Sequence, residues 1–320
     1  MSNPIRIAVF LRSHDNDYQA LLRESCRVAA RRHRFPLREV SASNDAEWQM
    51  QQLTECLAEP EAIRPRALIV FPVQEALLCP VAKAAAELGM AFVMLNRPWD
   101  YLGELRRAHP KVPLFCVMPD QRDIGRIQGQ QFRWLLHKGG VLVYVTGTVG
   151  TASAELRLEG MRRELSHLEV EIVVENGDWS QASGTRTIEH WLRTRGASSG
   201  ASVVVGAQND SMAMGARSAL VAASATLRRP ELAEILVTGC DGTPTYGQAL
   251  VGSNELAATV VVPPTTDRAV EELAQAFSTG RMPSADILLS VASFPDLAEL
   301  GAASRALTRA SRARSAHGPR

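Results

Sequence analysis

Excess charge of one sign, long hydrophobic runs and paired cysteine motifs are all scarce in this sequence. The formal net charge is +1 over 320 residues, which argues against a surface built to bind nucleic acid. No apolar run approaches the roughly 18–20 residues of a membrane-spanning helix, so we expect no membrane span. The five cysteines are scattered without CxxC spacing, and we interpret them as reduced thiols rather than as disulfides or a zinc site.

Motifs of common enzyme classes are absent as well. The seven histidines form no HExxH pattern, and no serine stands in a GxSxG turn. The glycine-rich segment 147–151 lacks the GK[ST] ending of a P-loop and the third glycine of a dinucleotide fingerprint. These absences favour a protein without catalysis, cofactor or metal, although catalytic residues that meet only in space leave no such motif.

The amino terminus carries no targeting signal. A strand-like apolar run at 5–11 follows the first four residues directly, without a basic region, a separate apolar core or a cleavage site. We therefore expect a cytoplasmic location for the sequence as written, which the scattered cysteines also favour. A periplasmic location is expected if a leader has been removed.

Short apolar runs alternate with longer amphipathic segments along the whole chain. A first set of strand-like runs lies at 5–11, 37–41, 67–71, 91–95 and 114–117. A second set lies at 141–145, 170–174, 203–205, 235–237, 256–261 and 287–291. Helical patterns separate the runs, for example at 75–88 and 152–165. This alternation predicts an α/β protein with two doubly wound parallel-sheet lobes, the first of them built on five strands.

Polar residues follow two of these runs at the point where each run ends. Gln208, Asn209 and Asp210 come directly after one buried-strand pattern, and Asp241 follows the next. In open α/β sheets ligands bind outside the carboxyl ends of the strands, so amides and carboxylates there predict a hydrogen-bonding site for hydroxyl groups. The alternative is that Asn209 and Asp241 only cap the helices that follow.

Two aromatic residues and an arginine fit the same chemistry. Tyr18 and Trp179 follow strand-like runs in a chain with 5% aromatic residues, and an aromatic face suits the apolar face of a sugar ring. Arg157 lies two turns into the helix after 147–151, where its planar guanidinium could grip neighbouring hydroxyl groups or a carboxylate. Ordinary packing is the alternative for each aromatic residue.

Together these segments resemble the type I periplasmic binding proteins of the ribose and galactose class, whose fold is shared by the effector domains of lactose-repressor-type regulators. The most specific segments are 207–216, 239–244, 256–260 and 150–160. The resemblance covers nearly the whole chain and implies two lobes that close over a sugar. It implies hinge crossings near Pro119-Asp120, Val262-Pro263 and Ser290.

The resemblance also implies domain bounds and binding residues. It assigns 4–118 with 264–288 to the N-terminal lobe and 121–262 with 289–300 to the C-terminal lobe. We expect a basic, disordered tail at 302–320, which holds five arginines, with a binding arm as the alternative. The residues that match the family's binding positions are Asn16, Tyr18, Asn96, Arg97, Arg157, Trp179, Asn209 and Asp241.

The sequence departs from the family's pattern at three places. Val262 stands where the family has a hinge glutamine, which removes one partner for a ligand hydroxyl. Arg12 replaces a small polar residue at the end of the first strand. Asp15 and Asp17 flank Asn16, where the ribose type has neutral residues. We therefore add Arg12 and Asp15 to the predicted binding residues.

Three arginines in one cleft raise the question of ligand charge. Arg12, Arg97 and Arg157 would be costly to bury unless countered, either by nearby aspartates such as Asp15 or Asp241 or by the ligand itself. An acidic ligand, such as a uronate, an aldonate or a phosphorylated sugar, is therefore one hypothesis beside a neutral sugar.

The predicted function is that of a non-catalytic solute-binding protein that closes its interlobe cleft on a sugar or sugar derivative. Its expected partners are a sugar-like small molecule and an ABC-type permease or a sensor protein. One alternative is the effector-binding component of a transcriptional regulator, but the roughly 50–60 residue helix-turn-helix region that such regulators carry at the amino terminus is lacking. The other alternative is an enzyme that acts on a sugar phosphate.

Overall fold

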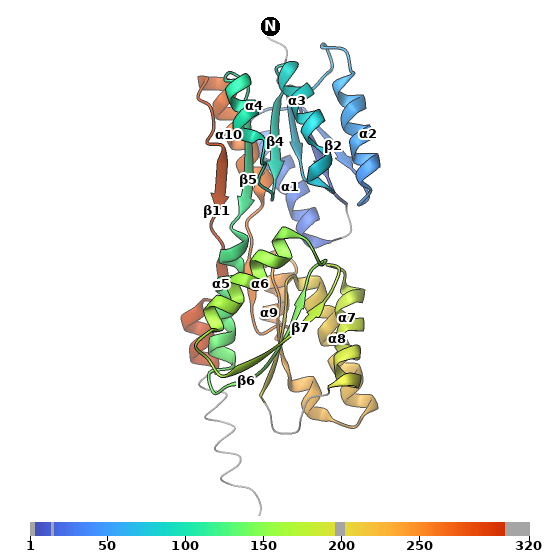
Figure 1. The fold of residues 1–320 in the computed structure, drawn as a ribbon, viewed down its shortest axis with the longest axis vertical. Helices are drawn as coiled ribbons and strands as arrows, with labels where there is room; N and C mark the ends of the chain where they lie inside the picture. Colours follow the sequence, from blue (N-terminus) through green and yellow to red (C-terminus); the bar gives the residue numbers. More distant parts are fainter. Residues whose placement is uncertain (1–3, 14–15, 196–201, 305–320) are drawn as a thin grey trace, which may run out of the picture. The chain divides into compact units, whose positions relative to one another are not determined.

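The computed structural model describes residues 4–13, 16–195 and 202–304, which divide into two compact α/β units (Figure 1). The first unit contains the chain up to Pro119 and the segment Pro263–Leu289. The second contains Asp120–Val262 and the chain from Ser290 onwards, so the chain passes between the units three times. None of the helices within the described ranges is both long and apolar enough to cross a membrane.

Six parallel strands form the sheet of the first unit, in the order β11-β5-β4-β3-β1-β2. Their bounds are β1 Ile7–Leu11, β2 Leu37–Ser41, β3 Ala67–Val70, β4 Ala91–Leu95, β5 Leu114–Pro119 and β11 Asp286–Leu289. The prediction of five strands is therefore wrong by one. The sixth strand, β11, comes from late in the chain and pairs with β5, the last strand of the first series.

Helices cover both faces of this sheet. They are α1 Asp17–Arg32, α2 Ala46–Leu57, α3 Cys79–Glu87, α4 Leu102–Ala108 and α10 Thr265–Thr279. Helices α1 and α10 pack together on one face, and α2, α3 and α4 cover the other (Figure 1). Because both faces are covered, every residue of β1, β3 and β4 is buried, which explains their continuous apolar sequences.

The sequence predicts one helix over 75–88, whereas the structure divides this segment. A single 3₁₀ turn, η1 Glu75–Leu77, comes first, and α3 then begins at Cys79. Pro80 occupies the first turn of α3, where its missing N–H would have no helical partner in any case. The proline therefore favours a helix start at this point over a helix interior.

Four parallel strands form the main sheet of the second unit, in the order β7-β6-β8-β9. Their bounds are β6 Gly140–Thr146, β7 Val170–Asn176, β8 Val203–Ala207 and β9 Leu236–Thr238. A separate antiparallel pair, β10 Thr259–Val261 with β12 Ala292–Phe294, was not predicted. The α/β architecture with parallel main sheets is confirmed.

The helices of the second unit also form two layers. They are α5 Gln121–Leu135, α6 Ala152–Leu165, α7 Gln181–Thr194, α8 Asp210–Thr226, the short α9 Gly247–Gly252 and the 3₁₀ segment η2 Pro230–Glu234. Helices α5 and α6 enclose one apolar cluster against the sheet, and α7 and α8 enclose another. Residues 302–304, assigned above to the tail, are helical, and the Ser304 hydroxyl donates to the Trp134 carbonyl oxygen at 2.8 Å. The rest of the predicted tail lies outside the described residues.

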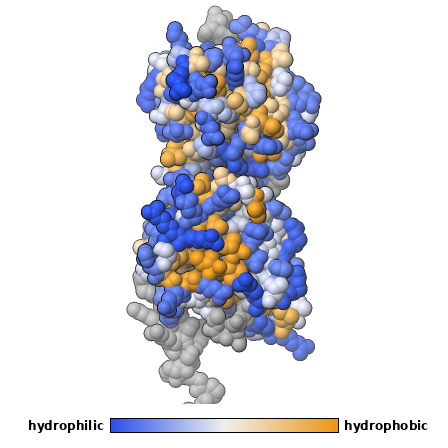
Figure 2. All heavy atoms as spheres, viewed as in Figure 1, coloured by the Kyte–Doolittle hydropathy of each residue, from blue (hydrophilic) through white to orange (hydrophobic). Residues whose placement is uncertain are grey.

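One edge of the second sheet is apolar at the surface. Figure 2 shows apolar side chains gathered over β6 and β7 on the face in view, and β7 is an edge strand that pairs with β6 alone among the described strands. Val170 and Ile172 of β7 are only partly buried. Glu171 and Glu175 alternate with them and place charge along the edge, which opposes pairing with a further strand.

A buried carboxylate holds several segments of the second unit together. Asp210, the first residue of α8, is 2% exposed. Its Oδ2 accepts a hydrogen bond from the Gly242 N–H at 2.8 Å, and its Oδ1 accepts one from the Thr259 hydroxyl at 2.7 Å. A Cβ atom on Gly239 or Gly247 would lie 2.1 Å from one of these oxygens, so both positions need glycine. Asp210 is thus a structural residue.

We expect Asp210→Ala to lower the free energy of unfolding of the second unit by about 3 kcal/mol or more, since it leaves two buried donors without their charged acceptor. The control is Asp123→Ala, which removes a surface ion pair with Arg126 that is worth at most about 1 kcal/mol. Urea unfolding followed by circular dichroism measures both losses. Equal losses for the two variants would contradict the structural role of Asp210.

Candidate functional site

The predicted site residues of the first unit follow strands that are neighbours in the sheet. Strands β4, β3 and β1 are adjacent, so the residues after their carboxyl ends share one edge. Arg12 follows β1, and Asn96 and Arg97 follow β4. Asn16 and Tyr18 lie where α1 begins, after β1.

Asn16 and Tyr18 are largely used by the fold itself. Asn16 caps α1, because its side-chain oxygen accepts a hydrogen bond from the Gln19 N–H at 2.9 Å. Tyr18 is 8% exposed, and its hydroxyl donates to the Pro263 carbonyl oxygen at 3.3 Å. Little of this ring is left for stacking on a ligand. Asp15, predicted beside them, lies outside the described residues.

Asn96 carries a buried acceptor that the protein leaves unpaired. Its backbone has a φ of 63°, in the left-handed region that asparagine tolerates better than most residues, and its N–H donates to the Val117 carbonyl oxygen at 2.8 Å. The side-chain oxygen Oδ1 is buried and has no hydrogen-bond partner in the part of the chain that the structure describes. A buried polar atom of this kind is costly unless a ligand or water satisfies it.

Arg97 is countered by a residue that the sequence did not indicate. Its Nε lies 2.9 Å from Oε2 of Glu75, in η1 after β3, and the Arg97 side chain is 13% exposed. The aspartates proposed above to counter the arginines are therefore not needed at Arg97. The missed signal is that β3 and β4 are neighbours, because the loop after β3 then reaches the residue after β4.

Arg12 lies against an aromatic ring from the same edge. Its guanidinium carbon is 5.6 Å from the centre of the Phe71 ring, within the range of a cation–π contact. Phe71 directly follows β3 and is 8% exposed. The sequence pattern includes Phe71 in the strand, and only its position as the first residue after β3 makes it a neighbour of Arg12.

In the second unit, Arg157 and Trp179 contact each other. The Arg157 guanidinium carbon lies 5.5 Å from the centre of the Trp179 ring, and Arg157 is 7% exposed. Its Nε donates to Gln121 at 2.8 Å, while Nη1 donates to the Gln208 carbonyl oxygen and approaches the Cys240 sulfur at 3.5 Å. Within the described residues Nη2 has no partner, and it is not fully buried. Nη2 is therefore the nitrogen left for a ligand.

No negative charge of the described chain pairs with Arg157. Its partners are an amide, a carbonyl oxygen, a thiol and an aromatic ring. Burial raises the pKa of the Cys240 thiol far above its ordinary value, so this neighbour is neutral at physiological pH. Arg157 thus has no paired carboxylate among the described residues at the carboxyl edge of the second sheet.

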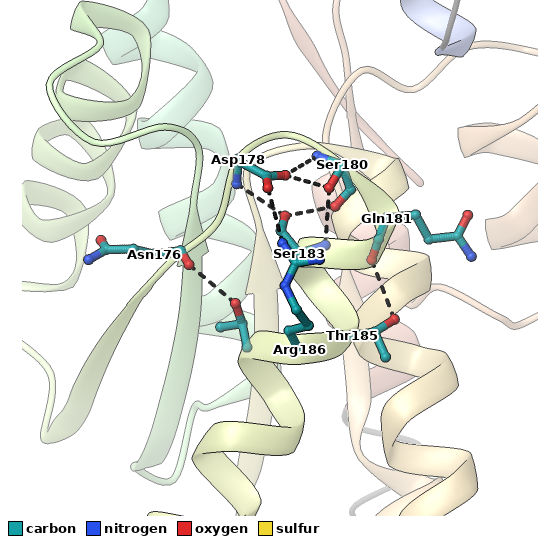
Figure 3. A network of polar contacts seen from close by, with 8 residues as sticks. Asn176, Asp178, Ser180, Gln181, Ser183, Thr185 and Arg186 are labelled. Carbon is teal, nitrogen blue, oxygen red and sulfur yellow. Dashed lines mark hydrogen bonds and ion pairs between the residues drawn. The ribbon is translucent and has the colours of Figure 1, made fainter.

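A hydrogen-bond network fixes the turn that carries Trp179 (Figure 3). The Asp178 carboxylate accepts from the Ser180 N–H at 2.9 Å, and the Asp178 N–H donates to the Ser183 hydroxyl at 3.1 Å. Trp179 between them has a φ of 72°, which is rare for a bulky side chain. The contacts on both sides of Trp179 therefore hold a backbone conformation that tryptophan alone disfavours.

Gln208 positions the residues around it, because its side chain is fully used by hydrogen bonds within the protein. It is fully buried, its Oε1 accepts from the Gly147 N–H at 2.8 Å, and its Nε2 donates to the Ala154 carbonyl oxygen at 2.9 Å. The Trp179 ring lies so close to Gly147 that a Cβ there would be 1.9 Å from a ring atom. Gln208 therefore fixes the loop on which the indole rests, in addition to holding Arg157 through its carbonyl oxygen.

Asn209 has the capping role given above as its alternative, together with a second role. Its oxygen accepts from the Met212 N–H at 2.8 Å, and its nitrogen donates to the Trp179 carbonyl oxygen at 2.9 Å. Asp241 is not the cap of α9, which begins only at Gly247. It has a φ of 106°, so its side chain stands on a strained backbone in the segment that follows β9.

These contacts give the edge of each sheet a defined chemistry. The first unit offers an acceptor on Asn96 and a guanidinium on Arg97, and the second offers Nη2 of Arg157 beside the Trp179 ring. In the described ranges, no group of three or more His, Cys, Asp or Glu side chains is arranged to hold a metal ion. The groups present suit hydrogen bonding to a polar, ring-shaped molecule.

The network in Figure 3 predicts a pH dependence. Partial burial acts to raise the pKa of Asp178, but hydrogen bonds from Ser180 and Ser183 and the charge of Arg186 lower it below its ordinary value of 3.8. The Asp178 carboxylate therefore stabilises the fold fully above the unfolded-state pKa and loses this effect as the pH falls through the lower folded-state pKa. We expect Asp178→Asn to lower the melting temperature at pH 7, and the difference from wild type to shrink as the pH falls below the ordinary aspartate pKa of 3.8. A difference in thermal melts that stays constant as the pH falls would contradict this role.

Two known proteins to which the chain is similar are named as sugar-binding proteins. The chain is 24% identical to the D-ribose/D-allose-binding protein of Pseudomonas aeruginosa over 219 residues, which are 68% of this chain and 66% of that protein. It is 22% identical to the D-apiose import binding protein of Actinobacillus succinogenes over 272 residues, which are 84% of this chain and 80% of that protein.

A solved structure and a family match agree with these relatives. An ABC transporter periplasmic solute-binding protein from Actinobacillus succinogenes, with bound D-allose, has a TM-score of 0.78 at 19% identity, covering 93% of this chain and 99% of that one. The periplasmic binding protein domain matches residues 7–278, which confirms the resemblance found in the sequence. The chain therefore belongs to the periplasmic binding protein domain family.

Proposed function

We propose that this chain is a non-catalytic solute-binding protein that binds a sugar-like molecule at the carboxyl edges of its sheets. The observation that carries the proposal is that two polar groups there, Asn96 Oδ1 and Arg157 Nη2, have no hydrogen-bond partner among the described residues. One accepts and the other donates. Hydroxyl groups do both, so a polyhydroxylated ligand suits the groups that each edge offers.

The relatives support a monosaccharide as the solute. Their names specify ribose, allose and apiose, and the similar structure holds D-allose. The partly exposed Trp179 ring, held in place by Asn209 and Gly147, offers a surface for the apolar face of such a sugar. Tyr18 is less suited to this role than the sequence suggests, because its ring is 8% exposed.

The relatives also bear on the biological role. One is named as an import binding protein and another as part of an ABC transporter, so we propose service to an ABC-type importer, with sugar sensing as the alternative. We expect a secreted form of the chain to work in the periplasm, as the family name indicates. Release of the ligand unchanged is expected because Gln208, Asn209 and Arg157 are held by structural hydrogen bonds rather than arranged as an acid and a base.

A thermal-shift screen tests the proposal. The panel holds D-ribose, D-allose, D-galactose, D-glucose and myo-inositol, each with the corresponding sugar acid where one exists. A ligand at about 100 times its Kd adds about 2.7 kcal/mol of stability, which shifts the melting temperature measurably. If no panel member raises the melting temperature, the proposed function is wrong.

Asn96→Ala tests the residue that carries the proposal. We expect it to raise the Kd of the best panel ligand about tenfold, as the loss of one buried hydrogen bond predicts. Asn254→Ala is the matched control, because Asn254 has nearly the same left-handed φ, 61° against 63°, and is exposed at the end of α9. Titration calorimetry measures both variants, and equal Kd values for them would exclude Asn96 from the site.

A further inference from the structure

We propose that Glu75 determines which ligand charge the site accepts. By pairing with Arg97, it makes the end of β4 suitable for an uncharged hydroxylated molecule and unsuitable for a carboxylate or a phosphate. This inference rests on the proposed function and assigns its specificity to a residue outside the predicted site. The three arginines in the sequence left open whether the ligand is neutral or acidic, and the role of Glu75 favours a neutral one.

The position of Glu75 follows from the order of the strands. Glu75 begins η1, which follows β3, and β3 lies beside β4 in the sheet. Its carboxylate is 2.9 Å from Nε of Arg97, and the two side chains are 45% and 13% exposed. The acid is thus the more exposed member of the pair and the arginine the more enclosed one. An incoming anion therefore meets the Glu75 carboxylate as well as the arginine.

The atoms that remain at the end of β4 favour a hydroxyl group over an acid. The closest approach of the pair joins Nε of Arg97 to Glu75, which leaves the terminal nitrogens of the guanidinium for a ligand. The adjacent Asn96 supplies a buried oxygen acceptor without a partner. A hydroxyl can donate to that oxygen while its neighbour on the same ring accepts from Arg97, whereas a carboxylate has no proton to donate.

Charge repulsion acts in the same direction. A ligand carboxylate bound by Arg97 would share one guanidinium with the Glu75 carboxylate, and two like charges at one site disfavour each other. The ion pair also reduces the charge with which Arg97 attracts an anion from solution. Neither effect weakens the binding of an uncharged sugar.

The test compares four proteins: wild type, Glu75→Gln, the double variant Glu75→Gln/Arg97→Gln, and the control Glu59→Gln. Glu59 pairs with Arg38 of β2 and belongs to the same unit, so its variant removes the same charge elsewhere on the sheet. The probes are neutral sugars with their acids: D-glucose and D-glucuronate, D-galactose and D-galacturonate, D-ribose and D-ribonate, D-allose and D-allonate. Calorimetry gives the Kd of each, and a thermal melt without ligand shows that each variant is folded.

We expect the wild type to bind a neutral sugar at least tenfold more tightly than its acid. Glu75→Gln should reduce this ratio on the order of tenfold, with a gain in acid binding that weakens as salt is added. The double variant should lose the gain, because the gain depends on the charge of Arg97, and Glu59→Gln should keep the wild-type ratio.

Two results would overturn the role of Glu75: an unchanged ratio in Glu75→Gln, or a wild type that already prefers the acid. A ratio that changes equally in Glu59→Gln would overturn it too, since net charge alone would then be the cause. If none of the four proteins binds any probe, the proposed function is overturned, and the role of Glu75 with it.

Discussion

Two buried polar side chains after β8 hold the edge of the second sheet in shape. Gln208 joins the loop after β6 to α6, and Asp210 joins the start of α8 to the segments after β9 and at β10. A buried polar network is rigid when its hydrogen bonds are all made, because each group left unpaired is costly. The loops that present Arg157 and Trp179 therefore cannot rearrange one at a time, and their side chains are fixed before any ligand arrives.

This constraint separates structural from ligand-binding atoms. The side chains whose hydrogen bonds the protein satisfies itself, such as Gln208 and Asn209, orient their neighbours. Asn96 Oδ1 and Arg157 Nη2, which have no hydrogen-bond partner in the described chain, are the atoms that we assign to a ligand. A preorganised site of this kind has a lower entropic cost of ordering on binding. Polar residues at strand ends thus divide into those whose hydrogen bonds the protein satisfies and those that keep an unpaired atom. The residue type alone does not show to which class a residue belongs.

The sequence predicts the elements well, because hydrophobic periodicity decides them locally. The strand at 37–41 and the helix at 152–165 have the bounds seen in the structure. The partner of β11 and the antiparallel β10–β12 pair were missed, since pairing over long sequence separations leaves no local pattern. At the site, the sequence located the strand-end residues but could not tell the cap Asn16 from the unpaired Asn96. The Glu75–Arg97 pair could not be predicted, because it depends on β3 and β4 being neighbours in the sheet.

A crystal structure of the protein with the tightest-binding sugar of the screen tests the central claim most directly. We expect a ligand hydroxyl within hydrogen-bonding distance of Asn96 Oδ1 or of Arg157 Nη2, and unchanged hydrogen bonds at Gln208 and Asp210. The claim would be contradicted if the sugar bound elsewhere, for example in the groove of the first unit that His33, Phe35 and Phe277 line. It would also be contradicted if the Gln208 and Asp210 contacts broke on binding.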